Sequence, residues 1–214
     1  MNTELRASIE KLYTAFSDVP KPLIIEGCPC CIERKGVDVL LTTPLRQITP
    51  DQLRNYAFSV FNTVGCVEDF LYFLPRILEI SASDMSWSPN PELVSAKMKT
   101  AGFREWQELR KSTIVSYYNS VLEIALGPEL SGWEIDTWIC ALGQIFPDIS
   151  TFLERLQDHP QKVVEYYEEN SDGLVKGRLT NSFWDDESAL AYDQVMAWFK
   201  SEPIRNMINA QYGL

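Results

Sequence analysis

The sequence predicts an all-α protein of nine or ten helices, and three observations support this fold class. Apolar residues recur at spacings of three and four over most of the 214 residues, which is the period of an amphipathic helix. Proline and glycine divide the chain into segments of helical length. Hydrophobic residues make up 45% of the chain, enough to bury a sizeable core. We expect one all-α domain over residues 1–214, either a multi-helix bundle or a short solenoid of helix pairs.

The first helix is expected at residues 4–16, and the segment after it departs from the helical pattern. Pro20 and Pro22 end this helix. Residues 20–49 then combine proline, glycine and cysteine with short apolar runs, which predicts a loop-rich segment. Within it, residues 37–41 fit either an extended or a short helical piece, because the run is too short to decide.

Two helices are expected between residues 50 and 80. Thr49 and Pro50 have the residue types of an N-cap and a first helical position, and Gly65 is the expected stop. The second helix begins at Glu68 or Asp69. Pro75 falls inside its pattern and predicts a kink or a split, because proline lacks the backbone donor.

Proline and glycine also mark the helix boundaries in the remaining chain. Ser88-Pro89-Asn90-Pro91 is a clear break, and Gly127-Pro128 is another. Further helices are expected at residues 91–100, 103–126, 133–146, 149–156, 160–169, 185–200 and 203–211.

The charge of the chain narrows its expected partners. Nineteen basic and thirty acidic residues give a net charge of −11. Such a chain repels nucleic-acid phosphates and anionic membrane surfaces. A basic protein partner is favoured instead, because opposite fields steer association. The N-terminal residues do not resemble a secretory signal and the apolar runs are short, so we expect a cytoplasmic protein.

Cys28-Pro29-Cys30-Cys31 is the most conspicuous chemical pattern. Cys28 and Cys31 have the spacing of a zinc knuckle, in which two thiolates on one turn share a tetrahedral ion. A second pair of ligands has to come from elsewhere, and the sequence has no second C-x-x-C. The candidate ligands are Cys28, Cys30, Cys31, Cys66, Cys140 and the single histidine, His159.

The same cysteines admit two other interpretations. A thiol at a helix N-terminus has a lowered pKa and exchanges disulfides, but the βαβ context of such redox motifs is absent here. The simplest interpretation is that the thiols pack as small hydrophobes at a turn stiffened by Pro29. Cys66 and Cys140 are expected in the core. His159 precedes Pro160, and a role at a helix end is expected for it.

Two arginines lie beside prolines in apolar surroundings, and they define a candidate binding surface. Arg46 follows Pro44-Leu45, and Arg76 follows Pro75. Each is expected to pair with a carboxylate, and the candidates are Glu68, Asp69 and Glu79. We expect any functional surface to include residues 20–49 and the helix around Asp69 to Glu79. The alternative is that the apolar residues of the segment only plug one end of the core, with Arg46 held in a salt bridge.

Several short motifs together resemble an uncharacterised family of bacterial proteins. They are Cys28-Pro29-Cys30-Cys31 (CPCC), Pro44-Leu45-Arg46 (PLR), Tyr56-Ala57, Thr63-Val64-Gly65, Asp69-Phe70 and residues 73–79 (FLPRILE). The resemblance implies a bacterial protein. It implies no activity, cofactor or catalytic residue.

The sequence holds no complete catalytic motif, which favours an interaction protein over an enzyme. No glycine-rich phosphate loop, H-E-x-x-H, EF-hand loop or G-x-S-x-G is present. We therefore expect a non-catalytic module that holds a protein partner, for example an acidic immunity or antitoxin-like protein. The alternative is a zinc-binding or thiol-redox protein that uses residues 28–31.

Overall fold

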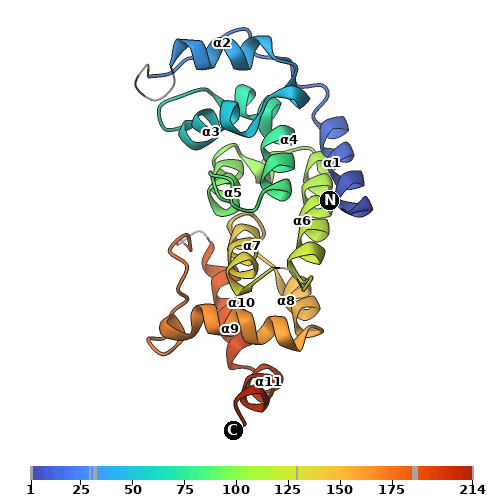
Figure 1. The fold of residues 1–214 in the computed structure, drawn as a ribbon, viewed down its shortest axis with the longest axis vertical. Helices are drawn as coiled ribbons and strands as arrows, with labels where there is room; N and C mark the ends of the chain where they lie inside the picture. The colour runs from blue at the N-terminus through green and yellow to red at the C-terminus, as the bar shows by residue number, and fades with distance from the viewer. Residues whose placement is uncertain (1, 29, 31–32, 129, 185–187, 214) are drawn as a thin grey trace. The chain divides into compact units, whose positions relative to one another are not determined.

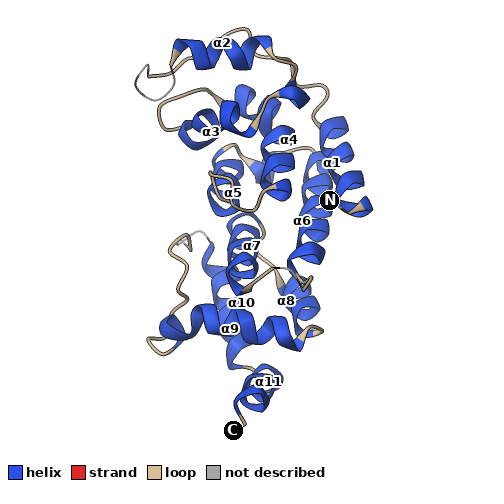
Figure 2. Ribbon diagram, viewed as in Figure 1, coloured by secondary structure: helices blue, strands red, loops and turns tan. Residues whose placement is uncertain are grey.

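A computed structural model describes residues 2–28, 30, 33–128, 130–184 and 188–213. Over these residues the chain forms eleven α-helices and short 3-10 turns, without a β-strand (Figures 1 and 2). The prediction of an all-α fold is therefore confirmed. None of the helices in the described ranges is long and apolar enough to cross a membrane.

The chain divides into two compact units, residues Met1–Ser120 and Val121–Leu214. We call them unit 1 and unit 2. The boundary falls inside α6 (Glu108–Ala125). The expectation of a single domain over residues 1–214 stays a prediction.

Unit 1 is organised around α4 (Val67–Ser83), which packs against α1, α3 and the 3-10 turn η1. Phe70, Phe73 and Leu74 on α4 are completely buried. The helix α2 packs on α3 rather than on α4. The other elements of unit 1 are α1 (Thr3–Ala15), α2 (Arg34–Thr42), η1 (Leu45–Gln47), α3 (Pro50–Ser59), α5 (Pro91–Thr100) and η2 (Phe103–Glu105).

The predicted helix boundaries of unit 1 are confirmed in part. Thr49 caps α3, and its hydroxyl and the side chain of Gln52 form a reciprocal capping box. Gly65 does not end this helix, because α3 already stops at Ser59. The split at Pro75 was also wrong, since α4 continues through it as one helix. Residues 37–41, which the pattern left open, belong to α2.

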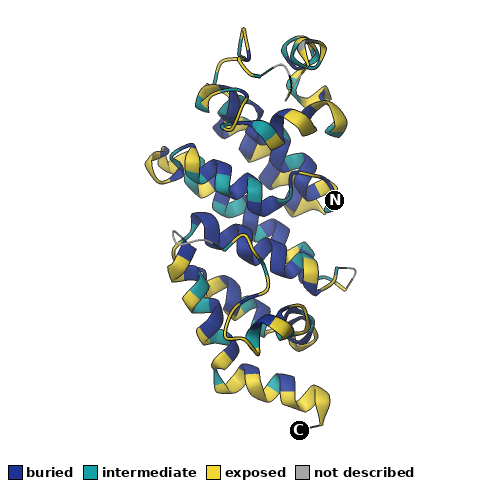
Figure 3. Ribbon diagram, turned by 90° about the vertical axis from the view of Figure 1, so that its left-hand side faces the viewer, coloured by how far each residue is buried: buried dark blue, intermediate teal, exposed yellow. Residues whose placement is uncertain are grey.

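Unit 2 is organised around two central helices, α7 (Gly132–Ile145) and α9 (Pro160–Leu174). The helix α7 is buried on almost every side, whereas α9 packs against α7, α8 and α11 and also carries exposed residues. The C-terminal helix α11 is largely exposed (Figure 3). Gly132 permits the close approach of these two helices, because a Cβ there would lie 2.1 Å from the carbonyl oxygen of Glu165. The other helices are α8 (Ser150–Gln157), α10 (Ala189–Lys200) and α11 (Glu202–Tyr212).

The helix α9 is longer than the sequence predicted. We expected it to end at residue 169, with a loop that includes Asp172-Gly173. The helix instead runs to Leu174, and Gly173 packs so closely on residues 178–180 that a Cβ would lie 2.7 Å from the carbonyl oxygen of Arg178. Gly173 therefore allows the following loop to pack closely on the helix, and it does not interrupt the helix. In the sequence, Asp185-Asp186-Glu187 predicts a cap for the next helix through the helix dipole, and these residues lie outside the described ranges.

A buried carboxylate fastens this loop to the core of unit 2. Asp136 on α7 is buried and accepts hydrogen bonds from the amides of Asn170 (2.9 Å) and Asn181 (2.8 Å). The side-chain oxygen of Asn170 in turn accepts from the backbone N–H of Thr180 at 3.0 Å. Burial raises the pKa of the Asp136 carboxyl above its ordinary value, although the two amides act in the opposite direction.

The raised pKa of Asp136 predicts how its contribution to stability depends on pH. The folded state holds this proton more tightly than the unfolded state does. The contribution is therefore complete below the unfolded pKa of about 3.9 and is lost as pH rises through the folded pKa. We therefore compare the unfolding free energy of the wild type with that of Asp136→Asn. As pH falls from 7 to about 4, we expect the wild-type value to increase relative to that of the variant. Urea unfolding followed by tryptophan fluorescence measures this, since four of the six tryptophans lie in unit 2.

Asp148→Asn is the matched control for this measurement. Asp148 is exposed, and hydrogen bonds from the backbone and side chain of Ser150 lower the pKa of its carboxyl. Its contribution is therefore complete above the unfolded pKa of about 3.9 and is lost only below it. Between pH 7 and about pH 4, the difference between Asp148→Asn and the wild type should stay nearly constant, and at lower pH it should change with the opposite sign. The same pH dependence in both variants would contradict the assignment.

Candidate functional site

The cysteine segment is anchored to the connection between α3 and α4. Gly27 forms an antiparallel bridge with Val64. On either side of it, the N–H of Cys28 donates to the carbonyl of Thr63 at 2.8 Å, and the N–H of Gly65 donates to the carbonyl of Glu26 at 2.7 Å. The cysteine motif that begins at Cys28 and the motif Thr63-Val64-Gly65 therefore meet at this bridge. Pro29 and Cys31, which complete the cysteine pattern, lie outside the described residues.

Tyr56, Cys66 and Asp69 surround the glycine that follows this bridge. Gly65 has a positive φ of 66°. A Cβ on it would lie 3.2 Å from the hydroxyl of Tyr56 and 3.3 Å from the Asp69 carboxylate. That carboxylate accepts from the backbone N–H of Cys66 at 3.2 Å and so closes the capping box of α4. The exposed Cys66 is an N-cap residue, so the expectation that it lies in the core was wrong, whereas Cys140 is buried as expected.

The electrostatics of this cluster do not favour a thiolate. Although Cys66 as a residue is exposed, desolvation around its thiol and a hydrogen bond with Glu68 raise the pKa of that thiol, despite its place at the start of a helix. Burial likewise raises the pKa of the Asp69 carboxyl and, most strongly, that of the Tyr56 hydroxyl. The Tyr56 hydroxyl is buried with no hydrogen-bond partner among the described residues. At neutral pH the thiol and the phenol therefore stay protonated.

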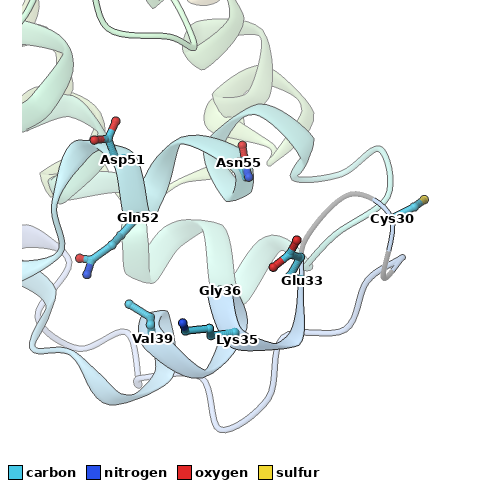
Figure 4. Close-up of a pocket in the computed structure, with 8 residues that line it drawn as sticks. All are labelled: Cys30, Glu33, Lys35, Gly36, Val39, Asp51, Gln52 and Asn55. Carbon is cyan, nitrogen blue, oxygen red and sulfur yellow. The ribbon is translucent and has the colours of Figure 1, made fainter.

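Cys30 lies at a cleft between α2 and α3, shown in Figure 4. The cleft has a volume of about 380 Å³, and its lining is mostly polar and exposed. In the view of Figure 4, the Cys30 thiol points away from the other labelled side chains. The residues that line the cleft are Cys30, Glu33, Lys35, Gly36, Val39, Asp51, Gln52 and Asn55.

Arg46 and Arg76 belong to one network of charges that joins α1, η1 and α4. The guanidinium of Arg46 donates to both carboxylate oxygens of Glu10, at 2.6 and 2.7 Å, and lies 3.7 Å from the ring centre of Tyr13. The Tyr13 hydroxyl donates to Glu79 at 2.6 Å, and Arg76 donates to the same carboxylate oxygen at 2.6 Å. The expected partner of Arg76 was therefore correct. Arg46 pairs instead with Glu10, because η1 and α1 both pack against α4.

The apolar part of the segment 20–49 divides between the core and the solvent. Ile25 and Leu40 are buried, as a plug of the core requires. Ile24 is 66% exposed and Leu23 is 96% exposed. Together with the ion pair of Arg46, the two buried side chains and the completely buried Ile48 account for how the segment is held on unit 1.

His159 lies in unit 2, whereas all the cysteines except Cys140 lie in unit 1. It precedes the first residue of α9, and its carbonyl accepts from the N–H groups of Lys162 and Val163. This placement agrees with a role at a helix end. Within the described ranges, no three histidine, cysteine or acidic residues are grouped as a metal site. Because Cys31 lies outside those ranges, the zinc hypothesis stays a prediction.

The charge of the chain is concentrated in unit 2. Unit 1 has fourteen acidic and thirteen basic residues, for a net charge of −1. Unit 2 has sixteen acidic and six basic residues, for a net charge of −10. Sequence reasoning considered only the total, and a separate count for each half of the chain would have found this asymmetry.

The exposed face of α9 carries part of this charge. Glu165, Glu168, Glu169 and Asp172 have the i, i+3, i+4, i+7 spacing that places residues on one side of a helix. We call these four residues the acidic face of α9. Glu165 pairs with Lys162 at 2.7 Å. Among the described residues the other three form no ion pair, and all three are exposed.

No protein-family model, no curated protein and no solved structure matches the chain. The family resemblance of the short motifs therefore stays a prediction.

The environment of Gly65 predicts that unit 1 depends on this glycine. Gly65→Ala forces a side chain into the left-handed region, at roughly 1–2 kcal/mol, and also brings its Cβ to 3.1 Å from the Tyr56 ring. Gly177→Ala is the control, because Gly177 has a φ of 72° with nothing within 4 Å of a Cβ. We expect Gly65→Ala to lower the unfolding free energy by about 1 kcal/mol more than Gly177→Ala does, since crowding adds to the strain. Equal losses in urea unfolding would show that the contacts of Gly65 contribute nothing.

Proposed function

We propose that the protein is a non-catalytic binding module that holds a basic protein partner on unit 2. The observation that supports this most is the distribution of charge, with a net −10 on residues 121–214 against −1 on residues 1–120. A charge that only keeps a protein soluble acts wherever it lies on the surface. A charge gathered in one unit also orients an oppositely charged partner and speeds its association.

The raised pKa of Cys66 disfavours this one thiol as a nucleophile. A nucleophilic or redox cysteine acts as a thiolate. Burial raises the pKa of the Cys66 thiol, so this thiolate is scarce at neutral pH. The neighbouring groups fasten segments together instead, as the capping box of Cys66 and Asp69 does.

One concrete form of this proposal is an immunity or antitoxin-like protein. Such a protein neutralises a basic toxin by covering its active surface, which requires a rigid acidic scaffold and no chemistry. The helices of unit 2, which share a buried core around α7, have this character. A toxin gene beside the gene for this chain would support this form, and a neighbourhood without one would weaken it.

Affinity capture followed by reconstitution tests the proposal. The full chain is used to capture proteins from cells that express it, and each candidate is purified and titrated by calorimetry. We expect a basic protein that binds with a defined stoichiometry and loses affinity about tenfold or more between about 50 and about 300 mM NaCl, because salt screens opposite charges. Candidates that fail to bind when purified, or whose affinity does not change with salt, would contradict the proposal.

The zinc and thiol-redox alternative makes a different prediction. A site built on Cys28 and Cys31 requires near-stoichiometric zinc, or one unusually acidic thiol. Under the binding proposal we expect substoichiometric zinc in the purified protein, and an unchanged Tm in the variants Cys28→Ser and Cys31→Ser. Elemental analysis, thiol titration and thermal melts measure these quantities. One zinc per chain, lost in both variants together with stability, would favour the alternative.

A further inference from the structure

We propose that the connection between α3 and α4, residues 60–66, is a latch that opens locally and so controls access to the half-buried thiol of Cys28. In the closed state, the bridge between Gly27 and Val64 holds the cysteine segment against this connection. The N–H groups of Cys28 and Gly65 donate the two hydrogen bonds that flank the bridge. The latch lies in unit 1 and goes beyond the proposed function, which places a partner on unit 2.

The backbone of the latch is strained at Phe61. Phe61 has a φ of 68°, and a bulky side chain rarely adopts this left-handed conformation. A strained residue persists only where its surroundings impose the conformation. Here the ring of Phe61 packs edge-on against Phe70 of α4, with 5.1 Å between the ring centres, and its N–H donates to the carbonyl of Val64 at 3.1 Å. Opening of the latch therefore releases strain that the closed state holds.

A buried cation contacts the latch, although burial disfavours its charge. Lys97 on α5 is 5% exposed, and its ammonium donates to the carbonyl of Val60 at 2.6 Å. An ammonium has three donors, and among the described residues Lys97 makes this one side-chain hydrogen bond and no ion pair. Burial lowers the pKa of this ammonium. Hydration of the charge therefore favours the open state.

A buried hydroxyl next to the latch also favours opening. Tyr56 is completely buried, and its hydroxyl has no hydrogen-bond partner among the described residues. It lies against Gly65, because a Cβ on this glycine would lie 3.2 Å from the hydroxyl oxygen. An unpartnered buried hydroxyl destabilises the closed state, since it has lost its hydrogen bonds to water. Movement of Gly65 lets water reach the hydroxyl and restores those bonds.

Three unfavourable features therefore meet in one short connection: a strained residue, a buried charge and an unpartnered hydroxyl. Natural chains break local rules of this kind mainly at functional or strained sites. The burial of Ile25 and Val64, which are 5% and 3% exposed, favours the closed state, as do the hydrogen bonds of the bridge. Because these terms oppose one another, we expect the latch to open under native conditions without unfolding of the α4 core.

Amide exchange followed by NMR, together with alkylation of thiols by iodoacetamide, tests the latch in the full chain. The variant Tyr56→Phe removes the unpartnered hydroxyl and keeps the ring. We expect it to slow the exchange of the Cys28 and Gly65 amides, and the alkylation of Cys28, about fivefold or more. The exposed Cys30 is an internal reference. Its alkylation, distinguished by tandem mass spectrometry, should keep its rate.

Tyr166→Phe is the matched control. Tyr166 in unit 2 is also completely buried, and its hydroxyl likewise has no partner in the described part of the chain. We expect this variant to leave the rates at Cys28 and Gly65 within a factor of about two. Equal slowing by both variants would show that these amides exchange through global unfolding, and it would overturn the inference. Unchanged exchange in Tyr56→Phe, or slower exchange without slower alkylation of Cys28, would also overturn it.

Gly65→Ala shifts the same equilibrium in the opposite direction. A side chain at this positive φ strains the closed state, so we expect the exchange of the Cys28 amide and the alkylation of Cys28 to become about fivefold faster or more. Gly177→Ala introduces a side chain at a similar φ in unit 2, and it should leave both rates within a factor of about two. Unchanged rates in Gly65→Ala would contradict the latch.

Discussion

The periodicity of α9 is the constraint on which the arrangement of unit 2 depends. This helix packs against α7, α8 and α11, so most of its surface is committed to the core. Val163, Tyr166 and Asn170 are completely buried. Only the opposite side of the helix is left outside the core. The charged positions of the helix therefore gather there. The packing of the core and the acidic face are two consequences of the same helical spacing.

Close contact between α7 and α9 holds this arrangement in place. Gly132 leaves no room for a side chain against the carbonyl of Glu165, and Asp136 fastens α7 to Asn170 and Asn181. Rigid support of this kind lowers the conformational entropy that a binding surface loses when a partner docks.

The sequence predicted the helices well, because each is an amphipathic segment bounded by proline, glycine or a capping residue. The helix at residues 91–100 has the expected bounds. The prediction failed where tertiary packing decides. The sequence predicts a helix stop at Gly65. In the structure Gly65 lies in the connection between α3 and α4, where it has a positive φ and lies close to Tyr56 and Asp69. Pro75 predicts a kink or a split, yet α4 continues through it as one helix.

The candidate site was harder to predict than the fold, because it depends on which segments meet. The pairing of Arg46 with Glu10 joins residues that are 36 positions apart, and no local pattern indicates it. The acidic residues of positions 121–214 can be counted in the sequence alone. The boundary at residue 120, which shows that they belong to one compact unit, comes from the structure. Total charge alone cannot distinguish a solvated surface from a binding face.

Hydrogen exchange of the full chain with and without its purified basic partner tests the central claim most directly. The account predicts that added protection is concentrated in unit 2, residues 121–214, and that amides of unit 1 change little. Protection confined to unit 1, for example at the segment 20–49 and α4, would contradict the assignment of the partner to unit 2.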